Sequence, residues 1–521
     1  LSDAVRHAVA AGDWPLAAAM VVDDLAIGQI IEPRDDQCLA DAFADMPSGQ
    51  EWATPAPYLV SAALAIAAGQ RESCAAALDA ADGLLRSSPA DEQAACRLTA
   101  AMLRLTVCLR SGNLPSAALA VSRAELMLDK VPGAKLARHP DVRRRVLSGR
   151  AVIETCSGRL DEAASLLEAG LAAEADSGRE YERASLTARL ALVEALRDRL
   201  ERAADLAGEA ALVASEHRPS GLGPAPLVAL AWVHVARNEL REARSCLKRA
   251  DAALGLCPDK LAGTVAYLVA ARGALAERRP AVAVQIIARA RAGWCVPAWL
   301  NQQLSLVESR AHATAGDFQA ALIAAERAGT SPEATVILAH VQAVAGDDEA
   351  AYRTLAPVLA PDSQVSEPVR LQALLVDARL SYDSGDDGHG RRSLASALRL
   401  AEHEQIRLPF VLDRSWLGPV LRRDPELANG HRPLLALTLG ADQIPAQLGV
   451  AAQLPVLIEP LTEREREVLI HVSGMLNTAE VAEEMYISVN TVKTHLRNIY
   501  RKLAAAHRSE AVRRARQLQL I

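Results

Sequence analysis

Aromatic residues are scarce in this 521-residue chain, and no segment alternates apolar and polar residues as a half-buried strand does. Phe, Trp and Tyr make up 3% of the chain, whereas 50% of its residues are hydrophobic and Ala and Leu dominate. Ala loses no side-chain entropy in a helix, and unbranched side chains lose little. The composition therefore predicts an all-α protein, and the length predicts several domains or an extended array.

Motifs of catalytic and nucleotide-binding sites are also absent. The chain holds no H-E-x-x-H, no G-x-S-x-G and no G-x-x-x-x-G-K-[ST] phosphate loop, and its twelve histidines are scattered. The group Asp386-Asp387-Gly388-His389 has the glycine content of a solvated turn rather than of a metal-ligand cluster. We therefore expect no enzyme activity, no metal site and no cofactor.

Closely spaced cysteines and long hydrophobic runs are lacking as well. No C-x-x-C pair exists among the eight cysteines, which we expect to be buried, reduced thiols: Cys38, Cys74, Cys96, Cys108, Cys156, Cys246, Cys257 and Cys295. The longest weakly polar stretch, residues 56–69, is too short to span a bilayer. We expect a cytoplasmic protein that has no membrane segment.

Charge is distributed unevenly along the chain. Residues 461–521 carry ten Lys/Arg and seven Asp/Glu, a balance of +3, whereas the rest carries 47 and 57, a balance of −10. From residue 489 onward there are eight basic residues and one acid, Glu510. A basic end on an acidic body fits a nucleic-acid-binding domain, although a balance of +3 alone decides nothing.

One short pattern recurs eight times before residue 352. A turn residue, often Gly, is followed by a polar residue, and Ala stands five places after the first; the turn residues are Gly12, Gly112, Gly158, Asp198, Asn238, Arg278, Gly316 and Gly346. A residue that tolerates a positive φ ends one helix, the polar residue starts the next, and the small Ala lets the two helices approach. The pattern predicts an array of helical hairpins in which each covers its neighbour.

The hairpin turn resembles the middle of a tetratricopeptide repeat, where Gly-Asp-aromatic-x-x-Ala joins two helices. The repeat here is longer, with turns 40 residues apart from 158 to 278, and the aromatic survives only as Trp14 and Phe318. We therefore expect a TPR-like solenoid over residues 1–435, in which residues 408–419 break the pattern and cap the array. Residues 436–460, poor in charge and periodicity, form the expected linker.

The C-terminal residues 461–521 predict four helices. Thr462 with Glu465 forms a capping box for the first helix, and Asn477 with Glu480 forms a similar cap for the second. Ser488 caps the third helix, over residues 489–503. The fourth runs from about residue 509 to residue 518.

The third of these helices has two distinct faces. Val492, Leu496, Ile499 and Leu503 fall at i, i+4, i+7 and i+11, which predicts a buried face. Lys493, Arg497 and Arg501 fall on another face. Two basic residues at i and i+4 alone also fit an ordinary solvated face.

The run ISVNTVKTHLRNIYRKL, residues 487–503, closely resembles the LuxR-type signature across its recognition helix. The resemblance extends upstream through Leu461-Thr462-x-Arg464-Glu465 and downstream through Arg508-x-Glu510-Ala511-Val512. It implies a four-helix LuxR-type helix-turn-helix domain whose third helix enters the major groove. The departures are Ala504-Ala505-Ala506 where the family has Gly, and His507 where it has a small polar residue.

The resemblance also implies roles for individual residues. Lys493, Thr494 and Arg497 match the positions that face bases. The positions that meet or flank the DNA backbone are Asn490, Thr491, His495 and Arg501, and His495 equally fits a packing and hydrogen-bonding role. The fourth-helix positions for dimerisation on DNA are Val512, Ala515 and Arg516.

The whole arrangement resembles the large ATP-binding LuxR regulators of the maltose-activator type, in which an ATPase precedes helical repeats. Either such an ATPase lies upstream of Leu1, which the missing methionine favours, or the protein never had one. We expect a bacterial transcription regulator that binds double-stranded DNA as a homodimer, controlled by a small-molecule or protein signal on the repeats. The alternative is a protein-interaction scaffold whose DNA-binding domain is masked or vestigial.

Overall fold

The computed structural model describes residues 1–31, 39–47, 49–86, 93–172, 180–217, 222–293, 295–439, 461–473, 478–485, 487–503, 511–512 and 515. These residues form helices and contain no strand, as the composition predicts. The chain divides into two compact units, Leu1–Ile444 and Pro445–Ile521. This division falls inside the predicted linker, most of which lies outside the described residues.

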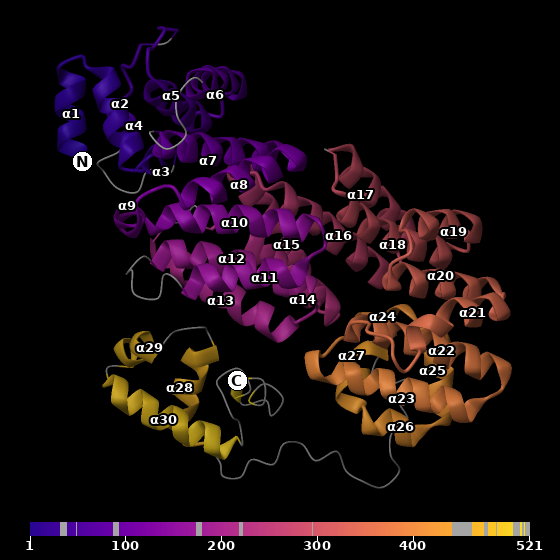
Figure 1. Cartoon of the computed structure of the whole chain (residues 1–521). Helices are drawn as coiled ribbons and strands as arrows, with labels where there is room; N and C mark the ends of the chain where they lie inside the picture. The colour runs from indigo at the N-terminus through magenta and orange to yellow at the C-terminus, as the bar shows by residue number, and fades with distance from the viewer. Residues whose placement is uncertain are drawn as a thin grey trace. The chain divides into compact units, whose positions relative to one another are not determined.

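The first unit is a TPR-like solenoid of antiparallel helix pairs that lie side by side from α1 to α23 (Figure 1). The pairs are α1 (Ser2–Ala10) with α2 (Trp14–Asp23), α5 (Pro55–Ala67) with α6 (Arg71–Arg86), α7 (Ala94–Ser111) with α8 (Leu114–Leu128), α10 (Pro140–Cys156) with α11 (Leu160–Ala172), α12 (Glu180–Leu196) with α13 (Leu200–His217), α14 (Ala225–Ala236) with α15 (Leu240–Leu256), α16 (Lys260–Ala276) with α17 (Pro280–Ala292), α18 (Ala298–Ala315) with α19 (Phe318–Arg327), α20 (Pro332–Ala345) with α21 (Asp348–Leu359), and α22 (Glu367–Ser384) with α23 (Asp387–Glu404). Short helices α3 (Gly28–Ile31), α4 (Leu39–Ala42) and α9 (Gly133–Arg138) connect some of them.

The turns between paired helices have the left-handed backbone that the pattern predicts. All eight predicted turn residues have a positive φ, including the non-glycine residues Asp198 (+55°), Asn238 (+59°) and Arg278 (+60°). The polar residue that follows caps the next helix in several hairpins, as where the Asp317 side chain accepts a hydrogen bond from the Ala320 amide at 3.1 Å. The predicted hairpin array is confirmed.

The small residue five places after each turn lies at the closest approach of the two helices. The eight predicted alanines are at most 2% exposed: Ala17, Ala117, Ala163, Ala203, Ala243, Ala283, Ala321 and Ala351. Two further hairpins, turning at Gly69 and Gly385, escaped the pattern because Cys74 and Gly390 replace the alanine. At Gly390 an added Cβ would lie 2.9 Å from the Tyr382 ring, so even an alanine would force a shift there.

Residues 408–439 form four short helices: α24 (Leu408–Leu412), α25 (Arg414–Arg423), α26 (Pro425–Gly430) and α27 (Arg432–Leu439). Their apolar side chains, such as Phe410 and Leu417, join the core of the last hairpin, α22–α23, in agreement with a cap. Leu408 and Val411 instead join the core built by α12 to α18. The segment therefore also reaches back across the solenoid, and α27 continues four residues into the predicted linker.

Two expectations about single residues were wrong. Asp387 to His389 are not a solvated turn, because they form the first turn of α23, where the Asp386 side chain caps the helix by accepting from the His389 amide. Cys257 and Cys295 are exposed rather than buried, and Cys38 lies outside the described residues. Within the described ranges no three metal-ligating side chains form a cluster. Nor does any described helix combine the length and apolarity that crossing a bilayer requires.

The turn geometry makes a testable prediction at Arg278, an exposed residue with φ +60°. A left-handed backbone costs an L residue about 1 kcal/mol more than glycine. We expect Arg278→Gly to raise the free energy of unfolding by about 1 kcal/mol and to raise the urea midpoint in far-UV circular dichroism. The control is Ala68→Gly in the exposed residue before Gly69, where φ is −82° and glycine should destabilise. A lower midpoint for Arg278→Gly would contradict the assigned strain.

Candidate nucleic-acid interface

The second unit is built around three described helices: α28 (Glu463–Ser473), α29 (Thr478–Glu484) and α30 (Val489–Lys502). They share one apolar core, composed of Leu461, Val468, Leu469, Val481, Ala482, Met485, Val492, Leu496, Ile499, Leu503, Ala511 and Ala515. The predicted buried face of α30 is confirmed, with Val492 and Ile499 at 0% exposure.

The start of α28 is the predicted capping box. The Glu465 amide donates to Thr462 Oγ1 at 3.3 Å, and the Thr462 amide donates to Glu465 Oε2 at 2.8 Å. Two backbone donors at the helix N-terminus are thereby satisfied reciprocally.

The same carboxylate holds the end of α30. Lys502 Nζ donates to Glu465 Oε2 at 2.7 Å, and both side chains are buried. Burial by itself raises the pKa of Glu465, but the hydrogen bonds from Lys502 and Thr462 outweigh it and leave that pKa below its ordinary value. The sequence analysis assigned Glu465 to the capping box only and missed this ion pair, because the partners are 37 residues apart.

The N-terminus of α30 is capped by Ser488, as predicted. The Thr491 amide donates to Ser488 Oγ at 3.1 Å, and the two hydroxyl oxygens lie 2.8 Å apart. Ser488, at the end of the short connection between α29 and α30, is thereby tied to the first turn of α30.

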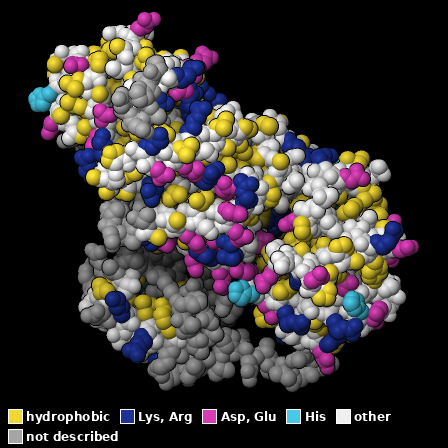
Figure 2. All heavy atoms as spheres, viewed as in Figure 1, with side chains coloured by type: hydrophobic (Ala, Val, Ile, Leu, Met, Phe, Trp, Pro, Cys, Tyr) yellow, Lys and Arg dark blue, Asp and Glu magenta, His cyan; other side chains and the backbone are white. Residues whose placement is uncertain are grey.

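The residues predicted to face bases lie on the solvent side of α30. Lys493, Thr494 and Arg497 are all exposed, and Figure 2 shows Lys and Arg side chains over this helix. The predicted backbone-contact residue Thr491 is exposed and His495 is half-buried. Asn490 and Arg501 belong to α30, but their side chains lie outside the described residues, as does the predicted cap formed by Asn477 and Glu480.

The predicted dimerisation residues are only partly described. Val512 is half-buried, whereas Ala515 is 0% exposed and belongs to the core of its own domain. Ala515 therefore has no surface to offer a second chain in this conformation. Arg516 and most of the predicted fourth helix lie outside the described residues, as do residues 504–506, where the sequence departs from the family.

A comparison with known protein families agrees with the helix arrangement of the second unit. Residues 459–515 match the model of the bacterial regulatory proteins of the luxR family. The C-terminal unit is a LuxR-family helix-turn-helix domain. The exposed side of α30, which carries Lys493, Thr494 and Arg497, lies within the matched residues.

Parts of known transcription regulators are also similar to this chain. The chain is 46% identical over 163 residues to MalT of Serratia proteamaculans and 31% identical over 163 residues to MalT of Vibrio cholerae, in each case covering 28% of this chain and 18% of the relative. It is 28% identical over 204 residues to MalT of Klebsiella pneumoniae, covering 35% and 22%. The matched region thus spans about a fifth of the length of these relatives.

Solved structures with a related arrangement of helices are distant. A human IFIT1 dimer with PPP-AAAA has 15% sequence identity and a TM-score of 0.39, covering 83% of this chain and 94% of that one. The APC/C hetero-tetramer Cut9-Hcn1 has 14% identity and a TM-score of 0.39, covering 99% and 96%.

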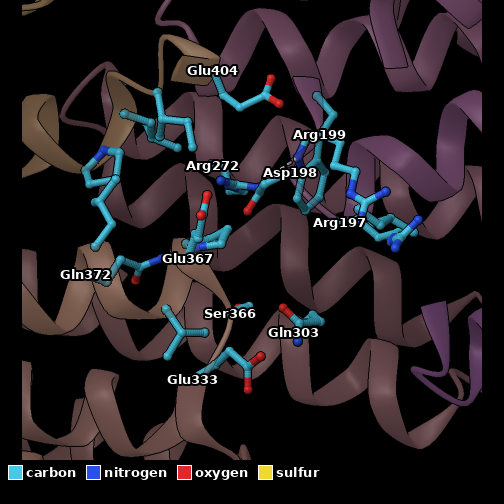
Figure 3. Close-up of a pocket in the computed structure, with 18 of the residues that line it drawn as sticks. Arg197, Asp198, Arg199, Arg272, Gln303, Glu333, Ser366, Glu367, Gln372 and Glu404 are labelled. Carbon is cyan, nitrogen blue, oxygen red and sulfur yellow. Dashed lines mark hydrogen bonds between the residues drawn. The ribbon is translucent and has the colours of Figure 1, made fainter. Parts of the chain in front are cut away.

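The solenoid contains a partly open cavity of about 1030 Å³ that no sequence motif predicted. Its walls come from the turn between α12 and α13, from the helices α14, α16, α18, α20 and α22, and from residues 400–412 (Figure 3). The lining is apolar in part, with Leu268, Leu306 and Leu412, and carries polar side chains such as Arg272, Gln303 and Glu333.

One side of this cavity is closed by residues 404–413, which we call the clasp. Glu404 Oε2 accepts from the Glu201 amide at 2.8 Å, and the Arg407 amide donates to the Ala236 carbonyl at 2.8 Å. The buried Arg310 guanidinium pairs with Asp413 at 2.8 Å. The clasp thereby joins the last hairpins to α13, α14 and α18.

Loss of the buried ion pair should weaken the LuxR-family domain. Glu465→Gln leaves the Lys502 ammonium buried without a counter-charge, so we expect the free energy of unfolding of residues 445–521 to fall by about 2 kcal/mol at pH 7. Glu467→Gln is the matched control, because its pair with Arg464 is solvent-exposed and contributes about 0.5 kcal/mol or less.

The same variant should change the dependence of stability on pH. Because folding lowers the pKa of Glu465, its stabilisation is present above the unfolded carboxyl pKa of about 4.3 and is lost as pH falls through the folded value. The difference in unfolding free energy between the wild type and Glu465→Gln should therefore shrink below about pH 4. A difference that is constant from pH 7 to pH 3 would contradict the pairing.

Proposed function

We propose that this protein regulates transcription by reading operator DNA through Lys493, Thr494 and Arg497. The observation that carries the proposal is the rotation of α30, which buries Val492 and Ile499 and leaves the basic side of the helix exposed in a LuxR-family domain. An α-helix fits the major groove, and Lys and Arg reach guanine O6 and N7.

Backbone contacts complete the proposed interface. Asn490, Thr491, His495 and Arg501 lie on the same helix and would position it through the phosphates without reading sequence. The Thr491 hydroxyl is already paired with Ser488, so its contribution includes holding the helix start. Two copies would meet on DNA through the fourth helix around Val512 and Arg516, and half-sites would follow the two-fold symmetry of the dimer.

The repeat array would supply control in the bacterial cytoplasm. Its cavity is large enough for a signal molecule, and the clasp links the cavity wall to the helices that precede the DNA-binding unit. A signal would act by binding one state of the array better than another and so shifting the population that is able to bind DNA.

Removal of the two exposed cations tests the proposed DNA contacts. We expect Lys493→Ala with Arg497→Ala to weaken specific operator binding by roughly 100-fold or more, because each base contact contributes about 1–3 kcal/mol. The measurement is a gel shift with genomic fragments selected by the wild type, alongside a far-UV circular dichroism spectrum that should not change.

The matched control is Arg464→Ala with Arg466→Ala, which removes the same charge from the exposed side of α28. This control should lose only non-specific, salt-dependent affinity. Retained specific binding in the α30 variant, or an equal loss in both variants, would overturn the assigned readout.

Control by the array is tested by comparing the full chain with residues 445–521. We expect the isolated unit to bind operator fragments more tightly than the full chain, because the array restrains the recognition surface in the absence of signal. If neither protein binds any genomic fragment at low salt, the scaffold alternative replaces the proposed function. Equal affinities would leave DNA binding standing and remove the role of the array.

A further inference from the structure

The charged groups of the solenoid cavity differ in whether they already have partners. Most of its arginines do: Arg197 pairs with Asp161 and Glu194, Arg202 pairs with Glu168, and Arg310 pairs with Asp413. Arg199 lies 3.8 Å from the buried Glu194 carboxylate. These cations are therefore committed to holding the walls together.

Arg272 is the exception among the cavity arginines. Its guanidinium carbon lies 4.2 Å from the centroid of the Trp232 ring, and no acceptor among the described residues lies within hydrogen-bond or ion-pair distance of it. The neighbouring Asp198 accepts from Trp232 Nε1 at 2.9 Å and interacts with Arg272 only at longer range. Burial lowers the pKa of Arg272, and the Asp198 charge offsets only part of this effect. The stacked guanidinium is thus oriented and lacks a bidentate partner.

Two carboxylates in the cavity lining have no described ion pair. Glu333 and Glu367 come from the first turns of α20 and α22, and Figure 3 shows Glu333 well apart from Arg272. The lining residues include seven Asp or Glu and five Arg, so the cavity carries an excess of negative charge. The lining also includes apolar side chains, among them Leu268, Leu306 and Val307, together with the amides of Gln303 and Gln372.

We propose that the cavity binds a short basic peptide that has a free carboxyl terminus. The terminal carboxylate of the peptide would pair with the Arg272 guanidinium, which stacks on the Trp232 ring. The basic groups of the peptide would face Glu333 and Glu367. Apolar side chains of the peptide would contact the leucine-lined wall, and its backbone would meet the two glutamine amides. The inference rests on the proposed function in one respect only, that the peptide would be the signal read by the array.

The size of the cavity and the position of the clasp support this class of ligand. About 1030 Å³ is at the upper end of the range for small-molecule pockets, which suits a chain of a few residues better than a single amino acid. Leu408 and Leu412 of the clasp belong to the lining, so a bound peptide would contact α24, the first of the last four helices of the array.

The test uses the full chain and defined pools of synthetic tetrapeptides. The first residue of each peptide is Lys or Arg and the others are Ala, Leu or Phe, and each pool is made as the free acid and as the C-terminal amide. We expect the free-acid pool to raise the Tm by at least about 2 °C at millimolar concentration, through preferential binding to the folded state. The amide pool, and a pool with Glu or Asp at the first position, should each bind at least ten-fold more weakly.

Variants connect this result to the cavity. Arg272→Met should bind the acid and amide pools equally weakly, whereas Arg241→Met, at an exposed position on α15, should behave as the wild type. The double variant Glu333→Gln with Glu367→Gln alters a half-buried and an exposed position. It should weaken binding of the basic pools and keep the preference for the free acid. The proposal is overturned if no pool raises the wild-type Tm, if acid and amide pools act alike on the wild type, or if both variants bind as the wild type does.

A gel shift on the same protein separates this proposal from the proposed function. Operator binding that persists without any peptide effect on Tm would refute the peptide site and leave the regulator intact. Peptide binding by a protein that binds no operator DNA would support the peptide site and refute the proposed DNA-binding function.

Discussion

The rotation of α30 about its own axis is the constraint on which the proposed DNA recognition depends. Burial of Val492, Leu496 and Ile499 in the domain core allows the helix one rotation only, since a turn of about 100°, one residue of an α-helix, would bring Lys493 into apolar surroundings. The packing of one face therefore determines which side chains the other face exposes, and these are the side chains proposed to contact DNA. The ion pair between Lys502 and Glu465 fixes the far end of the same helix.

The solenoid depends on two local requirements that recur in each hairpin. Each hairpin needs a left-handed residue to reverse the chain and a small residue where the two helices cross. Alanine meets the second need in eight hairpins, and Cys74 and Gly390 meet it in two others. A search for alanine alone finds most of the array but not all of it, because the physical requirement is small volume rather than one residue type.

Features that depend on residues close together in the chain were predictable from the sequence. The Thr462–Glu465 box, the Ser488 cap and the stripe through Ile499 follow from spacings within three turns of helix. Contacts between distant segments were not predictable, and the pair of Arg310 with Asp413 is an example, 103 residues apart. The cavity was not predicted for the same reason, since its lining comes from helices far apart in the sequence that only the superhelical path brings together. The two exposed cysteines were misjudged because residue type sets only a burial preference.

The clasp changes how the repeats of the array unfold. An open solenoid is quasi-one-dimensional, and its end repeats fray independently of the middle. Here Glu404, Arg407 and Asp413 connect the late hairpins to α13, α14 and α18, so the intervening repeats lie in a closed circuit. Melting of any hairpin in that circuit disturbs both sides of the closure at once. This stretch of the solenoid should therefore open and close as one cooperative block, rather than by unzipping from an end.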